Sequence, residues 1–218
     1  MFGESTRYFA LPALLLLCGA GLAEIIDRIA ISAGKQVITE AQIDEEVRLN
    51  AFIDAVELKL GAAERKAAAG RLIEQALVKR EMDLSRYPLP DLADADPALT
   101  GLKARYADDA KYRQELQAYG ITEESLKRRL WWQLTVLRFI DYRFRTGIQI
   151  PDVELQQYYQ QQVVKWRQQG IAPIPSLEDA RYQIQEILTQ QRIDQSLDAW
   201  LADARTQLVI RFHDEALQ

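Results

Sequence analysis

Residues 24–60 read EIIDRIAISAGKQVITEAQIDEEVRLNAFIDAVELKL, and the rest of the chain can be interpreted outward from this stretch. Four isoleucines within residues 25–31 favour a first strand, and the Ala-Gly-Lys sequence at 33–35 favours a turn into a short return strand. Thr39 then predicts the start of a helix, because its hydroxyl can accept from the Gln42 N–H while the Gln42 side chain reaches back. A lone two-stranded hairpin is marginal in water, so this hairpin needs a further strand.

Residues 208–212, with the sequence LVIRF, have the pattern of a short strand near the other end of the chain. We expect this segment to pair with residues 25–33. Such pairing ties the two ends of the folded chain together and supplies the strand that the hairpin lacks.

Helical periodicity fills the region between the strands, with polar caps, glycines and prolines at the boundaries. The expected ranges are 40–60, 62–84, 97–119, 122–146, 153–168 and 177–207. Gly61 is expected to end the first helix, and Asp152 and Ser176 to cap the fifth and sixth. The fourth helix carries apolar residues on two faces and is the expected centre of the core. The predicted fold class is therefore mainly α: a six-helix domain with a small β-hairpin paired to a C-terminal strand.

The composition narrows the chemistry that this chain of 218 residues can carry. Its net charge of −5 argues against general nucleic-acid binding, which needs a basic surplus. One cysteine, Cys18, and one histidine, His213, are too few for zinc sites, Ser-His-Asp triads or Cys-His dyads. The glycine-rich phosphate-binding motifs are also missing, so no cofactor or metal is expected. Carboxylate catalysis stays open, since no spacing singles out a pair.

Residues 1–23 have the layout of a secretory signal peptide. An apolar run at 9–17 follows Arg7, and small residues precede an expected cut after Ala23. The run is short for a membrane span, which needs about 20 residues. An uncleaved anchor and a lipid anchor on Cys18 are the alternatives. With cleavage we expect an exported periplasmic protein that makes no stable membrane insertion and has a single domain at 24–218.

Several phrases of the sequence resemble the chaperone domain of the SurA-type periplasmic proteins. They are VITEAQIDEEV (37–47), LIEQALVKREMD (72–83), LQAYGITEESLKRRLWWQL (116–134), VLRFIDYRF (136–144), IPDVELQQYY (150–159) and the segment 177–212. The resemblance covers essentially all of residues 24–212. It implies a domain made of an N-terminal part, 24–169, that is completed by a C-terminal helix and strand, 176–212.

That resemblance implies an ATP-independent chaperone that holds unfolded polypeptides, typically outer-membrane proteins. Many relatives also carry parvulin-type peptidyl-prolyl isomerase domains before the last helix. Here only residues 160–176 stand at that place, whereas a domain needs roughly 90 residues. We therefore expect no parvulin domain and no enzymatic activity. Two alternatives remain: an isomerase that acts through an unrecognised site or a partner chain, and a helical assembly subunit with one dedicated partner.

Aromatic side chains are the candidates for contact with a client. Trp131 and Trp132 are adjacent on a helix, so their side chains diverge by about 100° and cannot face one core equally. Tyr158 and Tyr159 have the same geometry, and Trp166 precedes a proline-rich loop. Ordinary core packing is the alternative role for each of the five.

Five arginines of the fourth expected helix admit two interpretations. They are Arg128, Arg129, Arg138, Arg143 and Arg145. They could form a basic patch for an acidic ligand, or a solvated helix face paired with nearby carboxylates, which is the more common arrangement. His213 follows the last strand and is expected to be an exposed tail residue.

Overall fold

The computed structural model describes residues 27–34 and 36–213. The expected signal segment 1–23, Cys18 and the turn residue Lys35 lie outside the described residues. The strands are β1 (Ile29–Ala33), β2 (Gln36–Thr39) and β3 (Ile210–Phe212), and the α-helices are α1 (Glu40–Ile53), α2 (Ala62–Ser85), α3 (Asp96–Lys103), α4 (Asp109–Tyr119), α5 (Glu123–Ile140), α6 (Asp152–Gln168) and α7 (Leu177–Thr206). A 3-10 turn η1 (Leu92–Ala95) precedes α3, and a π-helical turn η2 (Asp141–Arg145) follows α5. The mainly α class is confirmed, with seven α-helices in the described chain where six were expected.

The three strands form one antiparallel sheet in the order β2-β1-β3. Ile31 pairs with Ile38 on one side and with Phe212 on the other, so β1 is the central strand. Two further backbone bonds extend the β1–β3 contact: Gly34 N–H donates to Val209 O and His213 N–H donates to Ala30 O. The predicted pairing of the chain's two ends is confirmed, and the side chain of His213 is exposed as expected.

The start of α1 is confirmed, whereas its predicted end was wrong. Thr39 and Gln42 form the expected reciprocal capping box. The helix then ends at Ile53, not residue 60, in a Schellman motif in which Val56 N–H donates to Ala51 O. The motif uses Ala55 at a positive φ, where glycine is usual, so the sequence carried no glycine to signal the stop. Gly61 instead precedes α2 as its N-cap residue.

The segment expected to be one helix at 97–119 is two helices, α3 and α4. Asp108 is the reason, because its side chain accepts from Lys111 N–H at 2.7 Å and caps a new helix. The predicted fourth helix, 122–146, is helical over nearly its whole range, although regular α5 ends at Ile140 and the π-helical turn η2 completes it to Arg145. Asp152 does not cap α6: Pro151 holds that position, and the Asp152 carboxylate pairs with Arg181 of α7. Ser176 does cap α7, as predicted.

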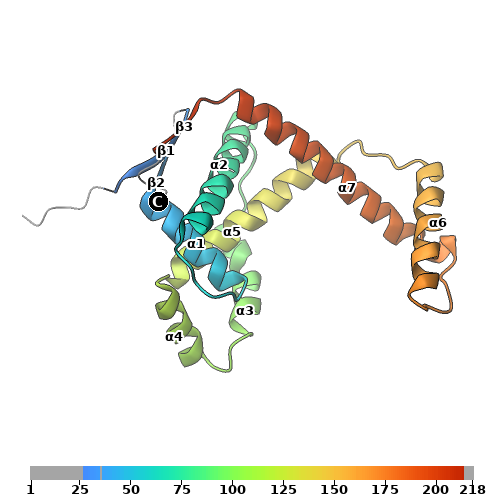
Figure 1. The fold of residues 1–218 in the computed structure, drawn as a ribbon, viewed down its shortest axis with the longest axis horizontal. Coiled ribbons are helices and arrows are strands. Elements are labelled where there is room, and N and C mark those ends of the chain that lie inside the picture. Colours follow the sequence, from blue (N-terminus) through green and yellow to red (C-terminus); the bar gives the residue numbers. More distant parts are fainter. Residues whose placement is uncertain (1–26, 35, 214–218) are drawn as a thin grey trace, which may run out of the picture.

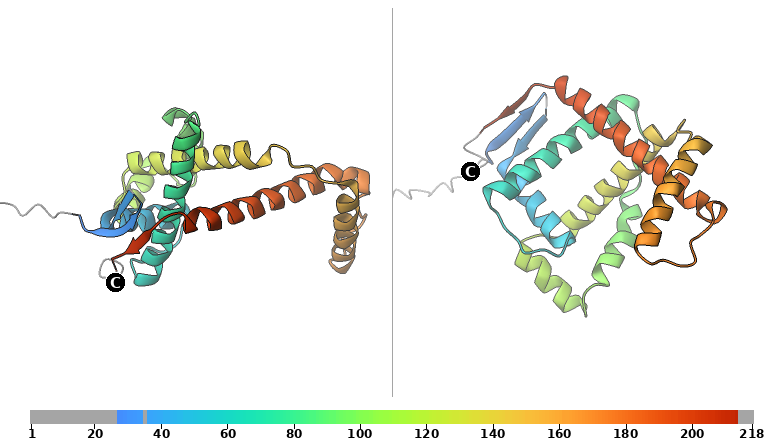
Figure 2. Two further views of the ribbon diagram at one scale, coloured as in Figure 1. Left: turned by 90° about the horizontal axis from the view of Figure 1, so that it is seen from above. Right: turned by 45° about the vertical axis from the view of Figure 1, so that its right-hand side comes forward.

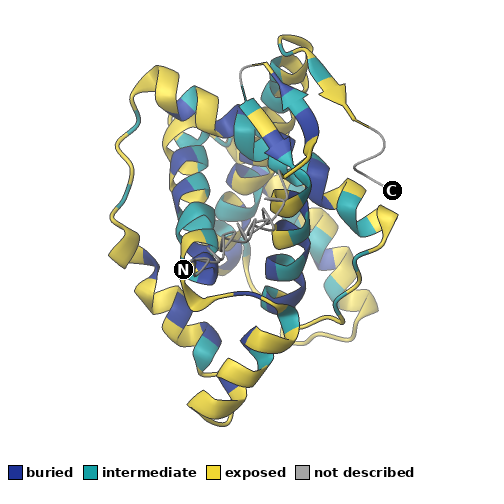
Figure 3. Ribbon diagram, turned by 90° about the vertical axis from the view of Figure 1, so that its left-hand side faces the viewer, coloured by how far each residue is buried: buried dark blue, intermediate teal, exposed yellow. Residues whose placement is uncertain are grey.

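The helices enclose a continuous body beside the sheet (Figure 1). One apolar cluster joins the hairpin, α1, α2 and the C-terminal end of α7, and a second joins α1, α3, α4 and α5. A third, small cluster of Val78, Met82 and Phe139 lies between α2 and α5. The buried residues form stripes on the inward faces of these helices (Figure 3).

Helix α7 gives the molecule its elongated shape. It runs for 30 residues from the body, near the sheet, to a far end where α6 packs against it (Figures 1 and 2). A separate cluster centred on Leu155, Ala180 and Ile184 holds α6 and α7 together. Within the described chain, no helix is both long enough and apolar enough to cross a membrane.

Candidate functional site

Trp131 and Trp132 are directed to different sides of α5, as their adjacency requires. The Trp131 indole packs beside the cluster of α1, α3 and α4, and its N–H donates to Pro90 O at 3.0 Å. Trp131 is therefore fastened to the loop that precedes η1. Its polar atom is used within the fold, although its ring also borders a cavity.

Trp132 lies toward α2, in contact with the cluster of Val78, Met82 and Phe139. Its indole nitrogen is buried and has no hydrogen-bond partner among the described residues. A buried N–H without an acceptor costs free energy, so such groups are uncommon in folded proteins. The two tryptophans thus differ in chemistry as well as in direction.

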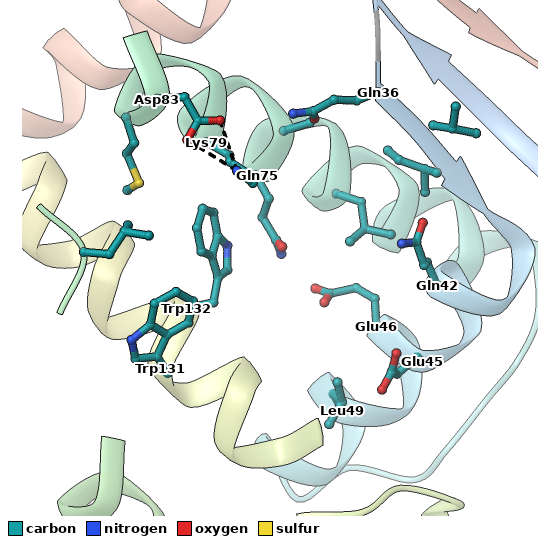
Figure 4. A pocket seen from close by; sticks show the side chains of 16 residues that line it. Gln36, Gln42, Glu45, Glu46, Leu49, Gln75, Lys79, Asp83, Trp131 and Trp132 are labelled. Atoms are coloured by element: carbon teal, nitrogen blue, oxygen red, sulfur yellow. Dashed lines mark hydrogen bonds and ion pairs between the residues drawn. The ribbon is translucent and has the colours of Figure 1, made fainter. Parts of the chain in front are cut away.

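The first cavity has a volume of about 420 Å³ and lies between β2, α1, α2 and α5. Its apolar wall consists of Val37, Ile38, Leu49, Leu72, Ala76, Met82, Leu89 and the two tryptophans. Polar side chains of α1 and α2 border the same space, among them Gln42, Glu45 and Gln75 (Figure 4). The cavity is open to solvent, so a segment of another molecule can enter it.

The second cavity has a volume of about 530 Å³ and lies between α2, α5 and α7. Its apolar wall consists of Val78, Trp132, Val136, Leu137, Ile140, Leu197 and Leu201. Leu137 of α5 is 65% exposed and stands at the border of this cavity. Gln75 and Trp132 border both cavities, so the two spaces adjoin at these residues.

A buried ionic network stands beside that boundary. Glu46 is 4% exposed and lies 3.2 Å from Nε of Arg71 and 3.3 Å from Nε of Arg129. Asn50 completes the network by donating to Glu46 Oε1 and accepting from Arg129. The network links α1, α2 and α5. It lies beside the two cavities, which are located between α2 and α5.

Glu46 was not among the candidate residues predicted from the sequence, and the network was therefore missed. A signal was present, because Glu46 stands three residues after Ile43 and three before Leu49, inside the apolar stripe. A charge at such a position must find a partner in the interior.

The five arginines of the α5 region each pair with a carboxylate. The pairs are Arg128–Glu124, Arg129–Glu46, Arg138–Asp94, Arg143–Glu81, and Arg145 with Asp141 and Glu186. The structure thus agrees with paired charges, not with a basic patch for an acidic ligand.

Tyr158, Tyr159 and Trp166 lie in the α6–α7 cluster at the far end of the molecule. The Tyr159 ring meets Trp166 edge-on, and its hydroxyl donates to Pro175 O at 2.8 Å. These three half-buried residues therefore fasten α6 and the following loop to α7. The fold brings Trp131 and Trp132 to a common cavity and places the other three candidates elsewhere.

Burial raises the pKa of Tyr112, and the negative charge of nearby Glu123 raises it further. No set of three or more histidine, cysteine, aspartate or glutamate side chains in the described ranges is placed to hold a metal ion. What the cavities offer chemically is apolar surface with a few hydrogen-bonding groups.

Comparison with protein-family models and with curated protein sequences gives no match to the chain.

Proposed function

We propose that the protein is an ATP-independent, SurA-type chaperone of the periplasm that holds unfolded polypeptides, with outer-membrane proteins as the expected clients. The observation that carries this proposal is the pair of adjoining, open, apolar cavities along α2, α5 and α7. A concave site with mostly apolar walls and a few polar groups is what a folded protein uses to hold an apolar ligand.

The openness and the combined extent of the two cavities favour a polypeptide client over a small substrate. Together they extend from β2 to α7 across the width of the body, and exposed apolar side chains such as Leu89 and Leu137 stand at their borders. Exposed apolar patches on a folded protein often mark an interaction surface. The phrases that resemble the SurA-type domain point to the same role.

The connection between α6 and α7 supports the chaperone over an isomerase of the same family. Residues 160–168 continue α6, and only the loop from Gln169 to Ser176 separates the two helices. In relatives this is where a parvulin domain stands, and the described chain has no domain there.

An aggregation assay tests the proposal directly. A urea-denatured outer-membrane protein is diluted into buffer without ATP, and light scattering is followed with and without the purified protein. We expect the mature chain to suppress scattering at a few-fold molar excess. Unchanged scattering would contradict the proposal, and background rates in a proline-isomerisation assay would set aside the enzymatic alternative.

A pair of surface variants locates the activity. Leu137→Asp places a charge at the border of the second cavity, whereas Tyr182→Asp places one on an exposed residue of α7 that lines neither cavity. Both side chains are mostly exposed, so each change should alter stability by only about 0.5 kcal/mol. We expect Leu137→Asp to weaken suppression of aggregation and Tyr182→Asp to preserve it.

A pull-down from an envelope extract tests the third alternative. If the protein is an assembly subunit with one dedicated partner, the pull-down should recover that partner in stoichiometric amount.

A further inference from the structure

Gln75 of α2 and Trp132 of α5 face each other where the two cavities adjoin. Figure 4 shows the nitrogen-bearing edge of the Trp132 indole directed toward the side-chain amide of Gln75. Both residues border both cavities, so they stand at the boundary between the two. We call this place the junction.

Two buried N–H groups at the junction have no hydrogen-bond acceptor among the described residues, so a client that reaches them could supply one. The buried Nε1–H of Trp132 has no acceptor among the described residues. The Nε–H of Arg129, which borders the second cavity, also makes no hydrogen bond there, although its charge is paired with Glu46. The Gln75 amide carries both a donor and an acceptor.

Apolar space flanks the junction on both sides. Met82 and Leu72 border the first cavity, and Val136 and Leu201 border the second. An arrangement of apolar pocket, polar pair and apolar pocket matches an extended polypeptide. Its backbone carries alternating N–H and C=O groups, and its alternate side chains lie about 7 Å apart on one face.

We propose that the junction binds the backbone of an internal, extended segment of the client, and this proposal rests on the proposed function. The Trp132 indole donates to a backbone carbonyl, and the Gln75 amide pairs with a neighbouring peptide group. Apolar client side chains on either side enter the two cavities. Recognition of this kind depends on the client's backbone and on its apolar side chains more than on its exact sequence. This suits a protein that holds many different chains.

Charge around the first cavity adds a preference. Asp83 is paired with Lys79, and Glu46 is paired with Arg71 and Arg129, so Glu45 is the lining carboxylate without an ion pair in the described chain (Figure 4). A client segment with lysine or arginine beside its apolar residues can pair with Glu45, whereas aspartate or glutamate there would be repelled.

Two tryptophans provide a matched pair of variants. Trp132→Phe removes the free N–H and keeps an aromatic ring, whereas Trp166→Phe makes the same change in the α6–α7 cluster, away from both cavities. The probe is a capped, fluorescently labelled peptide in which leucine and serine alternate between terminal lysines. Fluorescence anisotropy should show an affinity about fivefold weaker for Trp132→Phe, because one hydrogen bond is lost, and an unchanged affinity for Trp166→Phe.

A second probe weakens the carbonyl acceptor of the peptide and leaves the protein unchanged. In a series of depsipeptides, each central amide is replaced in turn by an ester, whose carbonyl is a weaker acceptor. One ester should bind the wild-type protein several-fold more weakly than the amide peptide, and Trp132→Phe should abolish that difference. This arm keeps the proposal testable even where Trp132→Phe unfolds the protein.

The outcomes separate this inference from the proposed function. If every ester and the amide peptide bind the wild-type protein with equal affinity, the proposed backbone contact at the junction is overturned. Suppression of aggregation would then still support the chaperone proposal. An equal loss for both tryptophan variants also overturns it. Absence of both peptide binding and suppression removes both proposals. If the protein dimerises in a concentration-dependent way and the peptide does not compete with dimerisation, the occupant is a second copy of the chain. That result also overturns the inference.

Discussion

Glu46 is the only charged residue that is buried in the described chain, and it determines how α1, α2 and α5 meet. Its carboxylate is shared by Arg71 and Arg129, so one acidic group serves two cations. Such a network contributes little beyond apolar packing while it is complete, and it becomes costly when one member is removed. Through Glu46 the network links Arg71 of α2 to Arg129 of α5 beside the cavities.

Replacement of Glu46 by alanine should lower the free energy of unfolding by about 3 kcal/mol, because Arg129 is then left buried without its carboxylate. Urea unfolding followed by circular dichroism measures the change. Glu124→Ala is the matched control, since the Glu124–Arg128 pair is exposed on α5 and should contribute at most about 0.5 kcal/mol. Similar losses for both variants would show that burial of Glu46 is not the cause.

Ala55 ends α1 in a left-handed conformation with φ of 54°. Glycine adopts this conformation without a steric penalty, so Ala55→Gly should raise the free energy of unfolding by about 0.5–1 kcal/mol. The opposite change at Gly120, which has φ of 64°, should destabilise the protein. A Cβ atom there would lie 2.7 Å from Nη1 of Arg48. Thermal unfolding of the two variants should give melting temperatures that move in opposite directions.

Tyr112 couples stability to alkaline pH. Burial raises its pKa in the folded state, so above pH about 10 the unfolded chain releases the phenolic proton first. The contribution to stability is complete below that pH and decreases as the pH rises further. In Tyr112→Phe the free energy of unfolding should therefore decrease less steeply above pH about 10. Urea unfolding measured across this pH range tests the prediction. The baseline is the difference in free energy of unfolding between the wild-type protein and the variant at neutral pH.

At the scale of elements, β3 holds the hairpin in place although it is only three residues long. It pairs with the central strand β1, and the chain on either side adds the bonds to Ala30 O and from Gly34 N–H. The side chains of Leu208 and Ile210 also pack on the cluster beneath the sheet. The hairpin therefore depends on a segment almost the whole chain away.

Deletion of Leu208–Phe212 should expose the hairpin to solvent exchange. Hydrogen–deuterium exchange of the amides in β1 and β2 should become at least tenfold faster, because an isolated hairpin is marginal in water. Arg205→Ala is the control. It breaks the exposed contact of α7 with Glu74 and should leave hairpin exchange unchanged. Unchanged exchange in the deletion variant would mean that α1 and α2 support the sheet alone.

At the scale of the whole molecule, α7 joins two separate apolar clusters. Its C-terminal half packs on the body through Trp200 and Leu201, and its N-terminal half packs on α6 through Ala180 and Ile184. Because the α6 cluster is small and remote from the cavities, the far end of the molecule should unfold at a lower free energy than the body.

Leu155→Ala should detach α6 without unfolding the body. Leu155 is 2% exposed, and its truncation should cost about 2–4 kcal/mol within that cluster. Amide exchange should accelerate in α6 and stay slow in α1, α2 and α5. Peptide affinity should persist if the junction is the main site. A large loss of affinity would instead assign client contact to the aromatic residues of α6.

Much of the fold could be predicted because the signals were local. The Thr39 capping box, the Thr122 and Ser176 caps, the apolar periodicity of α2 and α5 and the alternation in β3 all act within a few residues. The errors occurred where a local signal was weak or overridden. The stop of α1 uses Ala55 in place of glycine, and the break between α3 and α4 depends on a single capping aspartate.

The sequence by itself determined the mainly α class and most helix starts, because helix caps and apolar periodicity are short-range properties. It also indicated the pairing of the two ends, because a lone hairpin needs a third strand and LVIRF at 208–212 has a strand pattern. Only the tertiary structure decided which aromatic residues share a site. Trp131 and Trp132 are adjacent residues of the same type, and the sequence does not distinguish their roles. In the structure the Trp131 indole donates to Pro90 O, whereas the Trp132 indole faces Gln75 where the two cavities adjoin. That difference depends on where α2, α7 and the loop before η1 lie, and residues far apart in the chain are brought together only by packing.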